Sequence, residues 1–249
     1  MLARLLRLTV LPVLLLLAPA YPAGAADALT PAQKAEVEKV IHDYLMDHPD
    51  FMVEVLRAAE AHFKAQKAAN GKQTIASKRD ELLHDAGTAV GGNPDGDVTI
   101  VEFFDYRCPY CKQVEPALEA MAKDDPKLRI VYKEYPVLGA DSMFATKMAL
   151  AARMQGKYAA FHDAMMATKG QIGEQVILDV AKAAGVDVAR AKADMESSGV
   201  QEIIKRNYAL AESLDIQGTP AFIIGDTLVP GAADIDSLKK LVAEARHAG

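Results

Sequence analysis

The stretch Val98-Thr-Ile-Val-Glu-Phe-Phe-Asp-Tyr-Arg-Cys-Pro-Tyr-Cys111 decides the fold. Its first half, residues 98–104, is a nearly continuous run of β-branched and aromatic residues, which is typical of a buried central strand. Its second half brings Cys108 and Cys111 to the start of a helical pattern that continues to about Lys123. A Cys-x-x-Cys pair at a strand-to-helix turn predicts a redox-active site.

The spacing of the two thiols allows them to close a small disulfide ring across one helical turn. The thiolate is the nucleophile in disulfide exchange, so we expect Cys108 to be exposed at the helix N-terminus and ionised, with Cys111 turned inward. A helix dipole contributes only ~0.3–1 kcal/mol, so hydrogen bonds from backbone N–H groups are expected to supply much of the rest. Pro109 has no N–H to donate, and Tyr110 occupies the other intervening position. Arg107 could add positive charge nearby.

Two other interpretations of the cysteine pair are a permanent, inert disulfide and a metal half-site. Two thiolates can hold a soft ion such as Cu(I), so a periplasmic copper-binding protein is the alternative function. A metal site needs further ligands, and the histidines show no paired metal spacing, which favours solvated or core positions for all of them: His42, His48, His62, His84, His162 and His247. We therefore predict no metal and no cofactor.

Composition limits the remaining function classes. The chain has 249 residues, 51% of them hydrophobic and 25% charged, which is typical of a globular protein. Only two cysteines are present, too few for a disulfide scaffold. The formal net charge of −6 and the absence of tryptophan argue against a nucleic-acid partner.

The N-terminus has the layout of a secretory signal peptide. Arg4 and Arg7 precede an apolar run over residues 8–17, and Ala23-Gly24-Ala25 fits a cleavage pattern. We predict a signal peptide over residues 1–25, cleavage near Ala25 and export to the periplasm, where disulfides persist.

A helical extension is predicted over residues 26–87. Thr30 and Gln33 form a capping-box pattern before a first helix, and Gly71 is expected to end a second one. Apolar residues recur at helical spacing across residues 31–69, and these faces need a partner. Gly, Pro, Asn and Asp then crowd residues 87–97, where we place a domain boundary.

The rest of the chain predicts an α/β fold. A second strand over residues 128–135 follows the helix after Cys111, and a helix-rich block fills residues 141–214. A hairpin over residues 221–229 and a final helix close the pattern. The predicted domain therefore comprises residues 88–140 and 215–249, with the helical block inserted between them.

These residues resemble the thioredoxin superfamily, and most of all the exported DsbA-type thiol–disulfide oxidoreductases. The matching text runs from Val101 to Pro116 and continues far downstream in Gly218-Thr-Pro-Ala-Phe222. The resemblance implies a thioredoxin fold with an inserted helical domain, with Cys108 attacking and Cys111 resolving. It also implies clients that are exported proteins with thiols or disulfides, and a redox partner in the membrane.

The resemblance assigns roles to supporting residues. It implies that Pro220 follows a cis peptide bond beside the sulfurs and that the Thr219 backbone pairs with a client strand. It implies that Glu102 is a buried acid behind Cys111, with Lys133 as its partner. The alternatives are an edge-strand turn at Pro220 and a surface salt bridge between Glu102 and Lys133.

The helix after the cysteines carries two further matches. Glu115 matches an acid of the DsbA group, with a solvated helix face as the alternative, and Pro116 matches a proline that kinks this helix. Tyr110 stands where the DsbA type usually has histidine. This departure predicts a moderately rather than extremely oxidising site.

The extension before the domain is similar to that of ScsC-type and dimeric DsbA-like relatives, which assemble through N-terminal helices. We expect a homodimer or homotrimer formed through residues 31–69. Several active sites facing one another suit disulfide isomerisation, whereas a lone site suits oxidation, and the sequence leaves both open. A third possible function is that of a chaperone or envelope-structural protein in which the cysteine pair is incidental.

Overall fold

The computed structural model describes residues 29–248, so the predicted signal peptide over residues 1–25 lies outside the described residues. The chain divides into two compact units, one ending at Glu60 and one starting at Ala61. Among residues 29–248, no helix is both long enough and apolar enough to cross a bilayer.

The first unit contains α1 (Pro31–Asp47) and the beginning of α2 (Pro49–Ser77). The predicted capping box is confirmed, because the Thr30 hydroxyl accepts from the Gln33 N–H and the Gln33 side chain accepts from the Thr30 N–H at 2.9 Å. No residue of α1 is buried. Most large apolar side chains of this unit are exposed: Leu29, Val37, Val40, Ile41, Tyr44, Met46, Phe51, Met52, Val53, Val55 and Leu56.

The second helix continues through Gly71 and ends at Ser77, so the prediction that Gly71 ends it is wrong. A glycine inside a helix costs about 1 kcal/mol relative to alanine, and burial of Ile75 against the sheet offsets that cost. Ion pairs of Lys67 with Asp215 and of Lys72 with Asp226 hold the same part of the helix. The short α3 (Arg79–Leu83) follows.

The second unit is built on a five-stranded mixed sheet with the order β1-β3-β2-β4-β5. Only β2 and β3 run parallel, and α4 (Pro109–Asp124) connects them. The segment 87–97, where the domain boundary was predicted, contains β1, which pairs antiparallel with β3 at the sheet edge. The strands are β1 (Ala89–Gly92), β2 (Val98–Phe104), β3 (Leu128–Glu134), β4 (Ala221–Ile224) and β5 (Thr227–Pro230).

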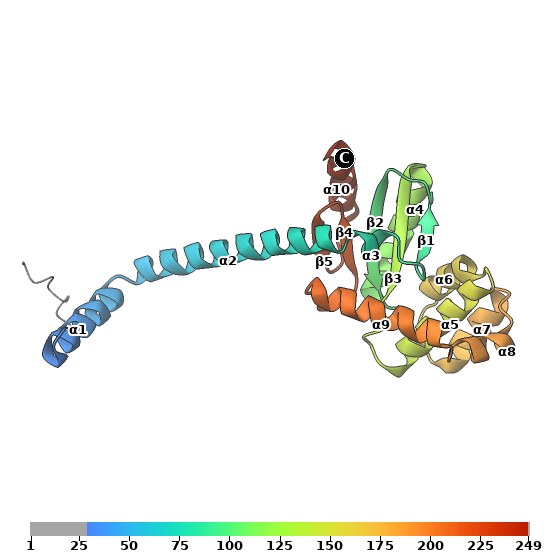
Figure 1. The fold of residues 1–249 in the computed structure, drawn as a ribbon, viewed down its shortest axis with the longest axis horizontal. Helices are drawn as coiled ribbons and strands as arrows, with labels where there is room; N and C mark the ends of the chain where they lie inside the picture. Colours follow the sequence, from blue (N-terminus) through green and yellow to red (C-terminus); the bar gives the residue numbers. More distant parts are fainter. Residues whose placement is uncertain (1–28, 249) are drawn as a thin grey trace, which may run out of the picture. The chain divides into compact units, whose positions relative to one another are not determined.

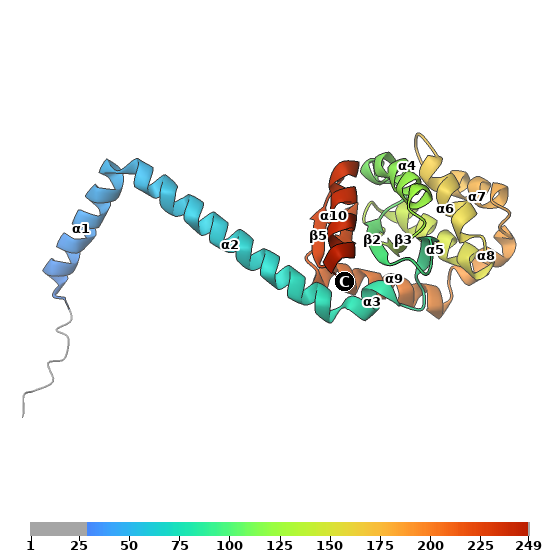
Figure 2. The ribbon, with the colours of Figure 1, turned by 90° about the horizontal axis from the view of Figure 1, so that it is seen from above.

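The two faces of β2 contribute to two cores. Ile100 and Phe104 belong to the core on the face covered by α4 and α10 (Ile235–Ala248). Figure 2 shows α4 and α10 on one side of the sheet, with α3 and α9 (Ser198–Ser213) on the other. Val101 and Phe103 belong to the core on the opposite face, covered by α3 and α9. Both faces of β2 are therefore buried, as its unbroken apolar sequence predicts.

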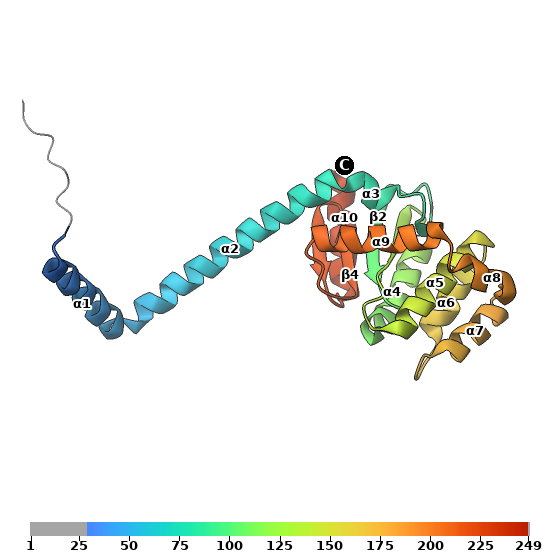
Figure 3. The same ribbon diagram turned by 60° about the horizontal axis from the view of Figure 1, so that its bottom comes forward.

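The helical block between β3 and β4 packs beside the sheet (Figures 1 and 3). Its elements are α5 (Ala140–Met154), α6 (Tyr158–Ala167), α7 (Glu174–Ala183), α8 (Val188–Asp194) and α9 (Ser198–Ser213). The buried α5 contacts each of the other four helices. The predicted α/β fold, with a helical insertion before the terminal hairpin and helix, is confirmed.

Candidate active site

The two cysteines lie at the start of α4, where β2 has just ended. Cys108 is the N-cap residue of α4, and Cys111 lies in its first turn. Asp105, which is fully buried, shapes the connecting loop: its carboxylate accepts from the Arg107 N–H at 2.7 Å and from the Leu138 N–H at 3.0 Å. This role was not predicted from the sequence, although an aspartate between a buried strand and a helix start is a signal for such a turn.

Cys108 is only 4% exposed, so the expectation of an exposed sulfur is wrong. The physical reason is the loop before β4, which covers it: Cys108 Sγ lies 3.2 Å from the Thr219 carbonyl oxygen, which accepts from the thiol. The Thr219–Pro220 peptide bond is cis, as expected. The edge-strand interpretation of Pro220 is wrong, because the proline directly precedes β4, which pairs with β2 and β5.

The surroundings of Cys108 favour its thiolate and lower its pKa to about 6. The largest cause is a hydrogen bond from the Cys111 thiol, followed by the Thr219 side chain and then by the N–H groups of Cys111 and Tyr110, while burial acts in the opposite direction. Backbone N–H donors therefore lower the pKa of Cys108 less than was expected from the sequence. Arg107 was expected to add positive charge near Cys108, but its guanidinium donates to the Leu138 carbonyl at 2.7 Å.

Cys111 is shifted in the opposite direction. Burial raises its pKa well above the ordinary value, and the hydrogen bond to Cys108 and the charge of Glu102 raise it further. One sulfur of the pair is thus set to ionise while the other keeps its proton. This is the asymmetry that a nucleophile and a buried resolving thiol require.

Glu102 lies on β2, fully buried, on the sheet face that α4 covers. Within residues 29–248 neither of its carboxylate oxygens has a hydrogen-bond partner. Its pKa is raised well above the usual range by desolvation first and then by the charges of Glu115 and Cys108. Glu102 is therefore a buried acid that favours its protonated form.

Lys133 is not the partner of Glu102, and that prediction is wrong. Glu102 pairs in register with Tyr132, so the next residue of β3, Lys133, points to the opposite face of the sheet. There its ammonium donates to the Glu81 carbonyl at 2.8 Å and to the Thr88 hydroxyl at 2.8 Å. The alternative of a surface salt bridge between Glu102 and Lys133 is also wrong, because both side chains are buried.

Glu115 is buried inside a polar network rather than on a solvated face. Its Oε1 lies 3.3 Å from His162 Nε2, and His162 Nδ1 lies 3.1 Å from the Tyr106 hydroxyl. The Tyr158 hydroxyl donates to Glu134 at 2.7 Å, and burial raises the pKa of Glu134 to about 7. From the sequence His162 was expected to be a solvated or core histidine, and nothing local in the chain marks it as part of a network.

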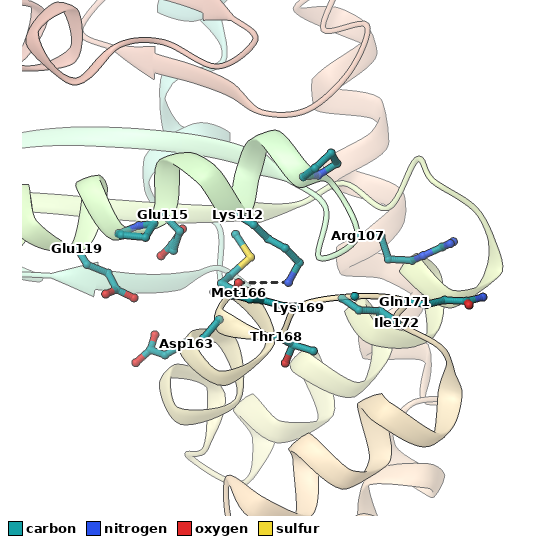
Figure 4. Close-up of a pocket in the computed structure, with 14 residues that line it drawn as sticks. Arg107, Lys112, Glu115, Glu119, Asp163, Met166, Thr168, Lys169, Gln171 and Ile172 are labelled. Atoms are coloured by element: carbon teal, nitrogen blue, oxygen red, sulfur yellow. Dashed lines mark hydrogen bonds between the residues drawn. The ribbon is translucent and has the colours of Figure 1, made fainter.

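Lys112, directly after Cys111, joins α4 to the helical insertion. Its ammonium donates to the carbonyl oxygens of Met165 and Met166 at the end of α6. Figure 4 shows the bond to Met166. Partial burial lowers its pKa to about 8. Pro116 lies inside α4, as predicted. Among residues 29–248 no group of three or more His, Cys, Asp or Glu side chains is arranged to hold a metal ion.

The family model for the DSBA-like thioredoxin domain matches residues 99–243, which include both cysteines and Pro220. The chain belongs to the DSBA-like thioredoxin family. It therefore has the fold of DsbA-like thiol–disulfide oxidoreductases. A second model, the N-terminal domain of the copper resistance protein ScsC, matches residues 33–67 ahead of the DSBA-like domain.

Solved structures support the same assignment. A thioredoxin-like oxidoreductase from Silicibacter pomeroyi DSS-3 is 45% identical, with a TM-score of 0.67 over 69% of this chain and 99% of that one. Proteus mirabilis ScsC in a transitional conformation is 31% identical, with a TM-score of 0.66 over 89% of this chain and 100% of that one. The second likeness therefore extends beyond the DSBA-like domain into the N-terminal helices.

Curated relatives match over part of their length. The thiol:disulfide interchange protein DsbA of Bordetella parapertussis is 31% identical over 52% of this chain and 64% of its own length. The Na⁺/H⁺ antiporter NhaA 1 of Salinispora arenicola is 28% identical over 63% of this chain, which spans only 24% of the antiporter. The likeness to both relatives therefore concerns only a part of each protein.

Titration of the reduced protein tests the asymmetry of the thiols. The thiolate absorbance is expected to rise with a midpoint near pH 6, whereas an ordinary cysteine titrates near pH ~8.5. Cys111→Ala removes the largest stabilising hydrogen bond, so the midpoint moves upward. Tyr110→Phe is the matched control, because it keeps the backbone N–H. A wild-type midpoint near the ordinary value contradicts the assignment.

Replacement of Glu102 tests its burial as an acid without partners. Its folded-state pKa is raised, so the carboxyl destabilises the fold increasingly as pH rises above about 4. Glu102→Leu should raise the free energy of unfolding by about 1–3 kcal/mol at neutral pH, with a smaller gain in acid. Urea denaturation measures this, with the exposed Glu202→Leu as control. A loss of stability in Glu102→Leu would show that the carboxyl has a favourable partner.

Proposed function

We infer that this protein carries out thiol–disulfide exchange with exported proteins through Cys108-Pro109-Tyr110-Cys111. The observation that carries the proposal is the pair of contacting thiols with opposite pKa shifts. A stabilised thiolate on Cys108 makes it a good leaving group at neutral pH, and the buried thiol of Cys111 is held beside it to resolve mixed disulfides.

Disulfide formation begins from the oxidised pair. A client thiolate attacks Cys108 Sγ, the bond between Cys108 and Cys111 breaks, and the electron pair leaves on Cys111, which takes up a proton. A second client thiolate then attacks the client sulfur of the mixed disulfide. The client disulfide forms, Cys108 leaves as a thiolate, and the protein has been reduced by two electrons.

Isomerisation uses the reduced pair. The Cys108 thiolate attacks a client disulfide and releases one client sulfur as a thiolate. That sulfur, or another client thiolate, attacks the mixed disulfide and releases Cys108 again, so no net oxidation occurs. If the client stalls, Cys111 attacks Cys108 and frees the client in its reduced form.

The neighbouring residues fit these steps. Glu102, protonated and behind Cys111, is placed to exchange a proton with the resolving thiol. Thr219, whose carbonyl lies 3.2 Å from Cys108 Sγ, would pair with the client backbone once the thiol no longer donates to it. Pro220 fixes the loop that carries Thr219, and the exposed ring of Tyr110 borders the site.

We place this reaction in the periplasm. The predicted signal peptide and the likeness to a Bordetella protein named a thiol:disulfide interchange protein support that location. After each net oxidation or reduction the pair has to be returned to its starting state, so a redox partner in the membrane belongs to the proposal.

We further propose a homodimer or homotrimer formed through residues 31–69. The exposed apolar side chains of α1 and the start of α2 support it, because they lack a partner within the described chain. The match of residues 33–67 to the ScsC N-terminal domain covers the same segment. An assembly with several redox sites would favour isomerisation over simple oxidation.

Variants of the two cysteines test the exchange reaction. Cys108→Ala should abolish reduction of insulin and form no mixed disulfides, because the attacking sulfur is gone. Cys111→Ala should accumulate mixed disulfides with exported proteins, because resolution fails. Non-reducing electrophoresis and an insulin assay measure both outcomes. Full activity in both variants would rule out the proposal, and stoichiometric Cu(I) binding by the reduced protein without exchange activity would favour the copper alternative.

Sedimentation of the mature chain tests the assembly. The wild type should sediment as a dimer or trimer, whereas Val40→Glu with Phe51→Glu should yield monomers, because both changes place charge among the exposed apolar side chains. Glu38→Lys, an exposed charged position of α1, is the control and should leave the assembly intact. The monomeric variant should lose recovery of scrambled ribonuclease yet still oxidise reduced ribonuclease. A wild type that sediments as a monomer contradicts the proposal.

A further inference from the structure

A cavity of about 610 Å³ opens beside the redox site, between α4 and the end of α6 with the loop that follows it. Figure 4 shows its wall, which starts at Arg107 next to the cysteines and continues along α4. Pro109 and Lys112 line the end nearest Cys108. A client held at Cys108 would therefore have this cavity directly at its side.

Three carboxylates gather at the far end of the cavity, on Glu115, Glu119 and Asp163. Figure 4 shows the carboxylates of Glu119 and Asp163 turned toward each other across the space between α4 and α6. Partial burial raises the pKa of Glu119, and the charges of Glu115 and Asp163 raise it further, while His162 acts in the opposite direction. Like charges placed together in this way destabilise the free protein.

Of these carboxylates, only Glu115 has a basic neighbour within residues 29–248, because its Oε1 lies 3.3 Å from His162 Nε2. Neither Glu119 nor Asp163 makes an ion pair there, and the buried Glu115 has one oxygen, Oε2, without a hydrogen-bond partner. The described residues hold no cluster suited to a metal ion. A cation supplied by a ligand would satisfy all three groups.

Two of the three basic residues of the cavity wall, Arg107 and Lys112, are engaged elsewhere. Lys112 donates to the carbonyl oxygens of Met165 and Met166, and Arg107 donates to the Leu138 carbonyl. Lys169 lies on the exposed loop and makes no ion pair with the carboxylates in the described structure. The far end of the cavity thus remains acidic.

We propose that this cavity is a specificity subsite that binds an arginine or lysine side chain of the client. The proposal rests on the exchange function proposed above. Glu119 follows Cys108 by eleven residues, which is about 16 Å along a helix, and an extended client chain covers that distance in about five residues. Clients with a basic residue about five positions from the reacting cysteine should therefore be preferred.

Two synthetic peptides test the subsite. Each has a single cysteine, with arginine five residues before or after it in one peptide and neutral citrulline at that position in the other. The rate at which each peptide thiol reduces the oxidised protein is measured at low ionic strength. The wild type should favour the arginine peptide by about five- to tenfold, as expected for a charge-assisted contact.

Variants of the cavity should change this ratio. Glu119→Gln with Asp163→Asn should bring the ratio close to one, and Glu119→Lys with Asp163→Lys should favour a glutamate peptide over its glutamine counterpart. Glu202→Gln on α9 removes a charge outside the cavity and should keep the wild-type ratio.

The outcomes separate the two proposals. If the oxidised wild type reacts with neither peptide, the exchange function itself fails. If it reacts with both at the same rate, or if the variants retain the preference for arginine, the exchange function stands and the acidic subsite is wrong.

Discussion

The hydrogen bond between the two thiols at the start of α4 is the interaction on which this site depends. It is the largest cause of the lowered pKa of Cys108 and one of the causes of the raised pKa of Cys111. The charge on Cys108 also raises the pKa of Cys111, so stabilising one thiolate makes the other harder to form. The proposed roles, with Cys108 attacking and Cys111 resolving, rest on this asymmetry between two chemically identical residues.

The rest of the fold holds this contact in place. The buried strand β2 delivers the chain to Asp105, whose carboxylate fixes the loop before Cys108. From the other side, the loop before β4 brings the Thr219 carbonyl to the Cys108 sulfur. Both strands lie inside the sheet rather than at its edges, so the backbone around the sulfurs is anchored in the most buried part of the domain.

Much of this could be predicted from the sequence. The apolar run of β2 and the helix after Cys111 follow from local patterns. The cis peptide bond before Pro220 was expected from the family resemblance of Gly218-Thr219-Pro220. Pairing across the sheet could not be predicted in this way, because Glu102 and Lys133 look like partners until the register places them on opposite faces. The prediction that Cys108 is exposed was wrong for a similar reason, because the loop that covers it is more than one hundred residues away in the chain. The roles of Asp105 and His162 also depend on contacts between distant segments.

Both ends of the helical block are tied to the redox loop. Asp105 binds the N–H of Leu138, just before α5, and Thr219, a few residues after α9, contacts Cys108. The chain thus leaves the sheet domain for the helical block and returns to it at nearly the same point, beside the redox loop. Its interior, including the wall it contributes beside α4, can therefore change without displacing the sulfurs, so the proposed client subsite and the proposed exchange chemistry can vary independently.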